Sequence, residues 1–508
     1  MNTTQNNKRI AKNTLLLYIR MLFLMLVSLY TSRINLKALG IEDFGIYNVV
    51  GGLVAMFSII SGALVSSVSR YLTFELGAGR IDRLKKVFSS AISIHIILCI
   101  IIILFAETIG LWFLNNKMTI PTNRIFATNI IYQFSVLSFC FSLLSIPYTA
   151  AIVAHEKMSA FAYISILDAI GKLAVAFTTS IVSTDKLIWF AGFILFNACI
   201  IRSIYTIYCK RNFEECKYNL IFDKPLLKEM FSFAGWNFIG TIASILRDQG
   251  GNIIINIFGG PTVNAARGIA MQVNNAVSGF VSNFQTALNP QITKSYASGD
   301  YKYMMTLIFQ GSRLSYYILL VLILPILCNT HFILQLWLGQ VPEHTVLFTQ
   351  LILLFSLNES LANPLINAML ATGHIKNFQI IVGGINLMNL PISYICLHNG
   401  CIPEVVIIVA TFISIICQIA RIMLLKRMIQ LPISIYFKKV YLNIISVSII
   451  SSIIPFGAKS VMEESYYTFF IVSLTCVFST LLSIIYIGCN KNERGFIFNK
   501  IISIKRKY

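Results

Sequence analysis

Apolar runs of about 20 residues recur almost from end to end of this chain, and that is the length a helix needs to cross a bilayer. The chain has 508 residues, of which 56% are hydrophobic and only 12% are charged. Its mean hydropathy is +0.76. An ordinary soluble domain carries about twice that share of charged residues. The sequence therefore predicts an all-α polytopic membrane protein instead of a series of soluble domains.

About 14 transmembrane helices are expected, in two groups of six and a final pair. The expected spans are residues 13–36, 46–69, 86–109, 125–153, 159–181, 187–209, 228–258, 264–289, 304–328, 346–371, 376–398, 403–425, 437–458 and 467–489. We assign residues 1–215 to an N-terminal lobe, 216–430 to a C-terminal lobe, and 431–508 to the helix pair and a basic tail. The first run is too long for a signal peptide and lacks a cleavage site, so it is expected to remain as a span.

Basic residues indicate how the chain is oriented in the membrane. Most of the 40 Lys and Arg lie in the N-terminus, the even-numbered loops and the C-terminal tail. The positive-inside rule makes these segments cytoplasmic, so both termini are expected in the cytoplasm. This distribution accounts for most of the net charge of +20, and nucleic acid is not expected as a partner. The expected outward loops are too short to form a catalytic domain.

Glycine and proline landmarks suggest an internal repeat. The intervals from Gly40 to Gly259, from Gly79 to Gly299 and from Pro147 to Pro364 are nearly equal in length. The period contains six spans, an even number, so both copies face the same way and are related by an axis along the membrane normal. This parallel repeat is typical of a two-lobed transporter. Chance matches between long helical sequences are the alternative.

Some basic residues lie inside the expected spans, where a cation costs about 2.5–3.5 kcal/mol on insertion scales. Arg202 and Arg313 lie near cytoplasmic ends and are expected to reach the surface with their side chains. Lys172 follows Asp168 by four residues, which permits either a structural helical ion pair or a place in a cavity wall.

Four arginines are our candidates for an anion site. Arg20 and Arg247 lie deep in the first and seventh spans, and Arg33 lies near the outer end of the first. Arg267 heads a polar stripe along the eighth span that includes Asn274, Ser278, Gln285 and Asn289 at helical spacing. With Lys172, these four polar residues are the expected cavity lining, although hydrogen bonds between helices would also explain such a stripe.

Acidic residues are scarcer than basic ones inside the spans. Asp168, Asp248 and Glu359 are the candidates for ion coupling. Glu359 could carry a proton or cap a kink near Pro364. Because buried bases outnumber acids, the expected ligand is an anion, and guanidinium groups bind phosphate through paired hydrogen bonds.

Motifs of soluble enzymes and metal sites are absent from the sequence. It contains no Walker lysine loop, no H-E-x-x-H and no C-x-x-C, and the eleven cysteines are scattered. We therefore expect no catalytic residues, no metal and no cofactor. Coupling to protons, to sodium or to the membrane potential stays open.

The segments ALGIEDFGIY at 38–47 and SSVSRYLTFELGAGRIDRLKKVF at 66–88 resemble the start of bacterial polysaccharide flippases. These flippases belong to the multidrug, oligosaccharidyl-lipid and polysaccharide exporter superfamily. The resemblance implies two six-helix lobes around a cavity, MATE-like, and transport of a polyprenyl-pyrophosphate oligosaccharide across the inner membrane, for example for O-antigen and lipopolysaccharide. It also implies membrane lipids, and other polysaccharide-assembly proteins, as partners. The pyrophosphate would then lie on Arg20, Arg33, Arg247 and Arg267.

Two other functions remain open from the sequence. A cation-coupled multidrug antiporter of the same superfamily would centre its cavity on acids, and Asp248 and Glu359 keep this interpretation open. A membrane enzyme that polymerises or ligates lipid-linked glycans would need a large outward loop with catalytic residues, which the expected topology does not provide.

Overall fold

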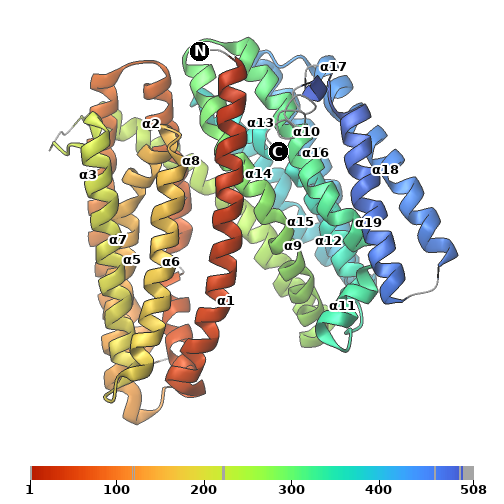
Figure 1. Ribbon diagram of the computed structural model, residues 1–508. Helices are drawn as coiled ribbons and strands as arrows, with labels where there is room; N and C mark the ends of the chain where they lie inside the picture. Colours follow the sequence, from red (N-terminus) through yellow and green to blue (C-terminus); the bar gives the residue numbers. More distant parts are fainter. Residues whose placement is uncertain are drawn as a thin grey trace, which may run out of the picture. The chain divides into compact units, whose positions relative to one another are not determined.

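The computed structural model describes residues 3–55, 57–116, 118, 120–219, 223–462, 465–490 and 493–495. The chain forms two compact units. Unit 1 comprises Met1–Thr241 and Thr293–Gly299, and unit 2 comprises Ile242–Ile292 and Asp300–Tyr508. Within each unit the helices run roughly side by side as a bundle (Figure 1). The residues described are overwhelmingly helical, as the apolar runs predict.

Unit 1 is built around α5, which packs against α1, α2, α3 and α7, while α6 packs against α1 and α7. Its helices are α1 (Thr3–Ala55), α2 (Ser58–Gly77), α3 (Ile81–Phe105), α4 (Leu111–Asn116), α5 (Ile125–Ala154), α6 (Met158–Ile181), α7 (Lys186–Asn212) and most of α8 (Lys224–Ile245). An apolar core of side chains from α1, α3, α5 and α7 includes Val50, Ile102, Tyr132 and Phe190.

Unit 2 is built around α16, which packs against α12, α13, α14 and α15. Its helices are α9 (Gly251–Ala297, in unit 1 from Thr293), α10 (Tyr301–Cys328), α11 (Thr330–Leu338), α12 (Thr345–Ser360), α13 (Ala362–Thr372), α14 (Lys376–Leu387), α15 (Asn389–His398), α16 (Val405–Ile429), α17 (Ile433–Tyr436), α18 (Leu442–Val461) and α19 (Tyr466–Ser483). The π-helical turn η4 (Leu246–Gly250) joins α8 to α9. The final pair, α18 and α19, packs against α10.

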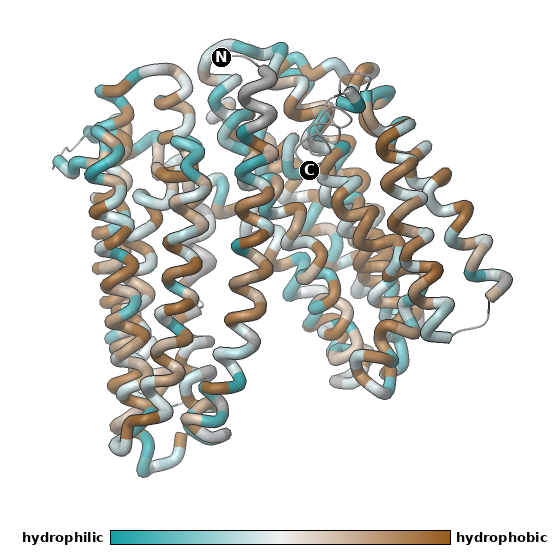
Figure 2. Tube along the Cα trace, in the orientation of Figure 1, coloured by the Kyte–Doolittle hydropathy of each residue, from teal (hydrophilic) through white to brown (hydrophobic). Residues whose placement is uncertain are grey.

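Eleven helices in the described part of the chain are long and apolar enough to cross a membrane. Apolar residues occupy most of the length of these helices, and hydrophilic residues are more frequent near the helix ends (Figure 2). Large apolar side chains stand exposed on the bundle surfaces, for example Phe126 at 75%, Phe196 at 64% and Ile181 at 83%. Such a surface suits lipid and not water. The chain is a multi-pass membrane protein.

Backbone geometry supports the internal repeat and corrects one landmark. The first kink lies at Gly40 (φ 79°, ψ 172°), and its counterpart is Gly260 (φ 73°, ψ −175°) instead of the expected Gly259. Gly259 is helical, so the expected pairing was wrong by one position. With Gly260 as the partner of Gly40, the interval between the kinks equals the interval between Gly79 and Gly299, both at positive φ.

A contact between a basic residue and a carboxylate recurs at matching positions as well. In unit 1, Arg124 binds Asp185, which caps α7, at 2.9 Å. In unit 2, His344 binds Glu404, the residue before α16, at 2.7 Å. The interval from Arg124 to His344 equals that between the kink glycines, and the interval from Asp185 to Glu404 is one position shorter. A repeated contact between two different helices is harder to obtain by chance than a repeated glycine.

Two of the expected spans divide into two helices close to a proline, which explains the division. The span near 346–371 divides at Leu361 into α12 and α13, and the span near 376–398 divides at Met388 into α14 and α15. Pro364 and Pro391 each lie one helical turn after these breaks. Proline lacks the N–H that would bond to the carbonyl four residues earlier and clashes with it, which ends the regular ladder.

Alanine at either kink glycine should destabilise the fold. Both Gly40 and Gly260 occupy a region of φ and ψ that is essentially restricted to glycine, so Gly40→Ala and Gly260→Ala should each cost about 1–3 kcal/mol. Gly45 and Gly268 are matched controls, since each is helical and an added Cβ would meet no atom within 4 Å. Alanine there should be neutral or stabilising.

The midpoint of thermal unfolding of the purified protein measures this effect. A lower midpoint is expected for the two kink variants, and an unchanged or higher one for Gly45→Ala and Gly268→Ala. Equal midpoints in all four variants would contradict the assigned backbone geometry.

Candidate functional site

Unit 1 contains an open cavity of about 820 Å³ lined by α1, α5, α6 and α7. Two residues of α1 after the kink at Gly40 also line it. Its volume lies within the range of about 300–1,000 Å³ typical of small-molecule sites. One face of α1 forms a wall of the cavity. The lining residues from this face are Arg20, Leu24, Val27, Ser28, Thr31, Ser32 and Asn35. Their spacings of three and four place them on one side of a helix.

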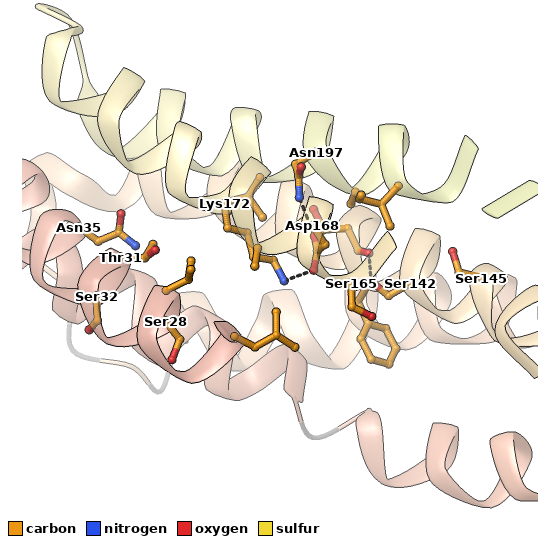
Figure 3. Close-up of a pocket in the computed structure, with 18 of the residues that line it drawn as sticks. Ser28, Thr31, Ser32, Asn35, Ser142, Ser145, Ser165, Asp168, Lys172 and Asn197 are labelled. Atoms are coloured by element: carbon orange, nitrogen blue, oxygen red, sulfur yellow. Dashed lines mark hydrogen bonds and ion pairs between the residues drawn. The ribbon is translucent and has the colours of Figure 1, made fainter. Parts of the chain in front are cut away.

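A carboxylate at the centre of the cavity is bonded on both oxygens. Asp168 Oδ2 accepts from Lys172 Nζ at 2.7 Å, and Asp168 Oδ1 accepts from Asn197 Nδ2 at 2.7 Å (Figure 3). The first contact joins residues on α6, and the second joins α6 to α7. Lys172 therefore combines the two roles that the sequence allowed, since it forms the helical ion pair and also lines the cavity. The pair carries no net charge.

Glycine at position 171 makes the second contact sterically feasible. A Cβ built on Gly171 would lie 2.0 Å from Asn197 Oδ1. Any larger residue would push the amide away from α6 and out of reach of Asp168. The close approach of α6 and α7 at this point thus depends on the missing side chain.

Arg20 supplies the excess positive charge of the cavity. Its guanidinium lies over the ring of Phe161 at 4.5 Å, a cation–π contact. Among the residues that the structure describes, no carboxylate lies within ion-pair distance of Arg20, and its Nε has no hydrogen-bond partner. The lining therefore contains two cations and one anion, and the unbalanced charge is on Arg20.

Hydroxyl and aromatic groups form the rest of the lining. Ser142, Ser145 and Ser165 donate to carbonyls of their own helices at 2.7–3.1 Å, which leaves their oxygen lone pairs able to accept. Aromatic side chains on the lining are Phe44, Tyr47, Phe139, Phe190 and Tyr205. The site thus combines apolar rings with many small polar groups, which is the usual construction of a binding pocket.

Unit 2 holds a different arrangement of charges at its own kinked segment. Arg247, in the π-helical turn η4, donates to Asp248 at 2.9 Å and to Asn386 at 3.4 Å. Arg267 donates to Asn252 Oδ1 at 3.0 Å and to the carbonyl of Asp248 at 3.1 Å. Both arginines are buried. The structure therefore brings Arg247, Arg267 and Asp248 together within unit 2.

Glu359 lies at the break between α12 and α13. It accepts from Ser414 Oγ and lies 3.8 Å from Arg421 on α16. Arg421 is buried and was missed by the sequence analysis, although it lies in the expected span 403–425. A complete list of bases within the spans would have included it, and its proximity gives Glu359 a cationic neighbour.

The polar stripe on α9 makes hydrogen bonds to other helices. Asn274 Oδ1 accepts from Ser356 at 2.6 Å and from Ser278 at 3.2 Å. Gln285 accepts from Asn363 at 2.6 Å and donates to the carbonyl of Ser360 at 3.4 Å. That carbonyl is the one that loses its helical donor at Pro364, so Gln285 replaces the missing bond.

The remaining candidates are more dispersed. Asn289 lies half-buried further along α9, and the Arg33 side chain is exposed on α1. Arg313 does not reach the surface as expected. Its side chain is 5% exposed and donates to the Gly488 carbonyl at 2.9 Å and to Glu493 at 2.8 Å.

The polar face of α1 was also overlooked in the sequence. Ser28, Thr31, Ser32 and Asn35 share the helical register of Arg20, in the same way as the stripe on α9. The hydropathy of the first span hides them, because serine and threonine lower it only slightly. A search for polar residues in register with a buried base would have found this face.

Alanine at Gly171 should disturb this site, while alanine at Gly192 should not. The Gly171→Ala side chain would clash with Asn197, an overpacking that costs about 1–3 kcal/mol. At Gly192 on α7, an added Cβ would meet Phe134 at 3.5 Å, an ordinary contact. Thermal unfolding of the purified variants should give a lower midpoint for Gly171→Ala only, and an unchanged midpoint there would argue against the Asp168–Asn197 contact.

Comparison with known proteins gives one family and one fold. A family model described as polysaccharide biosynthesis protein matches residues 10–296. No curated protein sequence matches the chain. The fold is similar to that of MATE in the bent conformation, with a TM-score of 0.73 at 12% identity over 85% of this chain and 98% of that one.

Two further solved structures show the same likeness. An outward-facing multidrug resistance MATE family transporter of the MOP superfamily has a TM-score of 0.71 at 13% identity, over 84% of this chain and 96% of that one. The MATE transporter ClbM in complex with Rb⁺ has a TM-score of 0.69 at 15% identity, over 81% and 94%. At these identities the likeness establishes the fold, which is the MATE fold.

Proposed function

Because this chain belongs to the family of polysaccharide biosynthesis proteins, we propose that it is a flippase for lipid-linked glycans. It would move a polyprenyl-pyrophosphate-linked oligosaccharide from the inner to the outer leaflet of the cytoplasmic membrane. The proposal includes cytoplasmic termini, assembly of a surface polysaccharide such as an O-antigen, and no covalent chemistry. Partners would be membrane lipids and other polysaccharide-assembly proteins.

The unbalanced guanidinium of Arg20 in a cavity among membrane-spanning helices is the observation that carries this proposal. A cation with no carboxylate beside it, in a low-dielectric environment, favours an anionic ligand. A pyrophosphate suits it because arginine keeps its charge and forms paired hydrogen bonds with phosphate oxygens. The assignment of Arg33, Arg247 and Arg267 to the pyrophosphate, which the sequence suggested, stays a prediction.

The three acids that we considered for ion coupling argue against a cation antiporter. Asp168 is paired with Lys172 at 2.7 Å and Asp248 with Arg247 at 2.9 Å, while Glu359 lies 3.8 Å from Arg421. A cation substrate needs a carboxylate whose charge is not already balanced. Each of these three has a base beside it. Proton or sodium coupling through any of them stays a prediction.

Leaflet exchange in liposomes tests the proposal. The probe is a polyprenyl-pyrophosphate oligosaccharide with a fluorescent label on the glycan, quenched from outside. The parent protein should accelerate exchange, and Arg20→Gln should slow it about tenfold or more. A charge-assisted hydrogen bond contributes about 1.5–3 kcal/mol, and about 1.4 kcal/mol corresponds to tenfold.

Arg202→Gln is the matched control. Arg202 is another guanidinium of unit 1, but it lies over Tyr148 at 4.4 Å and donates to Thr206, and it does not line the cavity. Exchange by this variant should stay near the parent value. An inactive parent that instead takes up an organic cation against a proton or sodium gradient would contradict the proposal, as would formation of glycan-transfer products.

A further inference from the structure

The cavity of unit 1 has more polar groups than an anion alone would use. Arg20 lies at one end of the α1 face, and Asn35 lies about 22 Å further along the helix. Between and beside them stand Ser28, Thr31 and Ser32. A phosphate at Arg20 would occupy one end and leave this row of small polar side chains to another part of the ligand.

We propose that this cavity recognises a sugar phosphate, with the phosphate at Arg20 and two or more sugar rings in a row along the polar face of α1. The inference rests on the proposed function. It adds that unit 1 binds the phosphate of the substrate together with the sugars attached to it. It assigns the selectivity for the glycan to lining residues of α1 and α5 and to Asp168 with its partners Lys172 and Asn197 on α6 and α7.

Polar atoms without partners support the sugar end of the site. Thr31 Oγ1, Asn35 Oδ1 and Ser138 Oγ are covered by protein and have no hydrogen-bond partner among the residues that the structure describes. All three side chains line the cavity. Rotation about one or two side-chain torsions turns these atoms toward a ligand. A sugar presents hydroxyls that both donate and accept, which suits hydroxyl and amide groups together.

The bonded groups suit the same ligand. Asp168 keeps carboxylate lone pairs beyond those used by Lys172 and Asn197, and carboxylates accept strongly from hydroxyls. The half-buried aromatic side chains of Tyr47 and Phe139 lie on the same lining and give the apolar face of a ring a surface to pack on. A simple phosphate would use neither.

In the corresponding segment of unit 2, polar side chains bind arginines of the same unit. Ser28 and Ser32 precede Asp248 and Asn252, respectively, by the same interval that separates Gly40 from Gly260. Asp248 and Asn252 bind Arg247 and Arg267 within the protein. At equivalent positions of the repeat, therefore, unit 1 presents small hydroxyls to a cavity, whereas the second unit uses an acid and an amide to hold arginines.

Binding of soluble sugar phosphates to the full-length protein in nanodiscs tests the inference independently of transport. The probes are the 1-phosphates of three trisaccharides, built from a hexose, an N-acetylhexosamine and a uronic acid, which are long enough to extend from Arg20 toward Asn35. Inorganic phosphate, the free trisaccharides and UDP-sugars are measured for comparison. At least one sugar 1-phosphate should bind more tightly than both inorganic phosphate and its free sugar. Tighter binding of a UDP-sugar would identify a nucleotide sugar as the ligand and overturn the lipid-linked assignment.

The variants separate the two ends of the site. Asn35→Ala and Ser138→Ala should each weaken the sugar phosphate about two- to tenfold and leave inorganic phosphate unchanged. Arg20→Gln should weaken both ligands. Ser203→Ala is the control, since Ser203 on α7 bonds to the Cys199 carbonyl and does not line the cavity.

Thermal unfolding distinguishes a binding role from a structural one. Removing a covered polar atom that has no partner leaves nothing unsatisfied, so Asn35→Ala and Ser138→Ala should keep or raise the unfolding midpoint. Unchanged sugar phosphate affinity in both variants, or no preference for any sugar phosphate over phosphate, would overturn the inference. If sugar phosphate binding fails these tests but leaflet exchange persists, the flippase proposal stands and only the inference about the sugar phosphate site is wrong. If sugar phosphates bind but no exchange occurs, the flippase proposal is wrong and the binding site stands.

Discussion

Hydrocarbon offers no hydrogen bonds, so each polar group inside the membrane-spanning part of this protein has to find a partner within the protein or at a wet surface. This constraint explains the fold and also the exceptions within it. Where Pro364 removes a helical donor, Gln285 donates to the carbonyl of Ser360 from another helix. Arg313 is buried, and the carboxylate of Glu493 balances its charge while the Gly488 carbonyl accepts a further hydrogen bond from it. Charged residues that look anomalous in the sequence are in this way part of the packing.

Polar contacts of this kind also hold the last two helices, α18 and α19, against α10 within unit 2. These two helices lie outside the repeat. Arg313 on α10 reaches the chain just after α19, and Tyr316 on α10 bonds Ser448 on α18 at 2.8 Å. Apolar packing alone gives little preference between lipid and a neighbouring helix, because both are equally apolar. Hydrogen bonds and an ion pair across the helix interface therefore give this pair a defined position.

Long apolar runs were enough to predict an all-helical membrane protein, because lipid imposes the same length and composition on every span. The repeat was predicted from glycine and proline landmarks. The proline breaks could be anticipated only in part, since Pro147 lies within the unbroken α5 whereas Pro364 and Pro391 follow breaks. The partners of the buried charges were beyond the sequence. Asp168 with Lys172 follows from helical spacing, but Arg421 beside Glu359 and Asn197 beside Asp168 join helices that only the fold brings together. Polar residues of the first span were missed for another reason, as serine and threonine fit apolar helices by bonding to their own backbone.

The repeat makes the charge pattern of unit 1 informative, because unit 2 shows what the same framework does with arginines when they serve its own structure. Arg247 and Arg267 are surrounded by Asp248, Asn252 and Asn386, so their removal would leave other groups unsatisfied. Arg20 has an aromatic ring beside it and open volume in front of it. A partly buried cation that the protein does not neutralise carries a desolvation cost, and part of that cost is recovered when an anion binds. The asymmetry between the two units thus points to unit 1 as the part of the chain in which binding energy is available for a ligand.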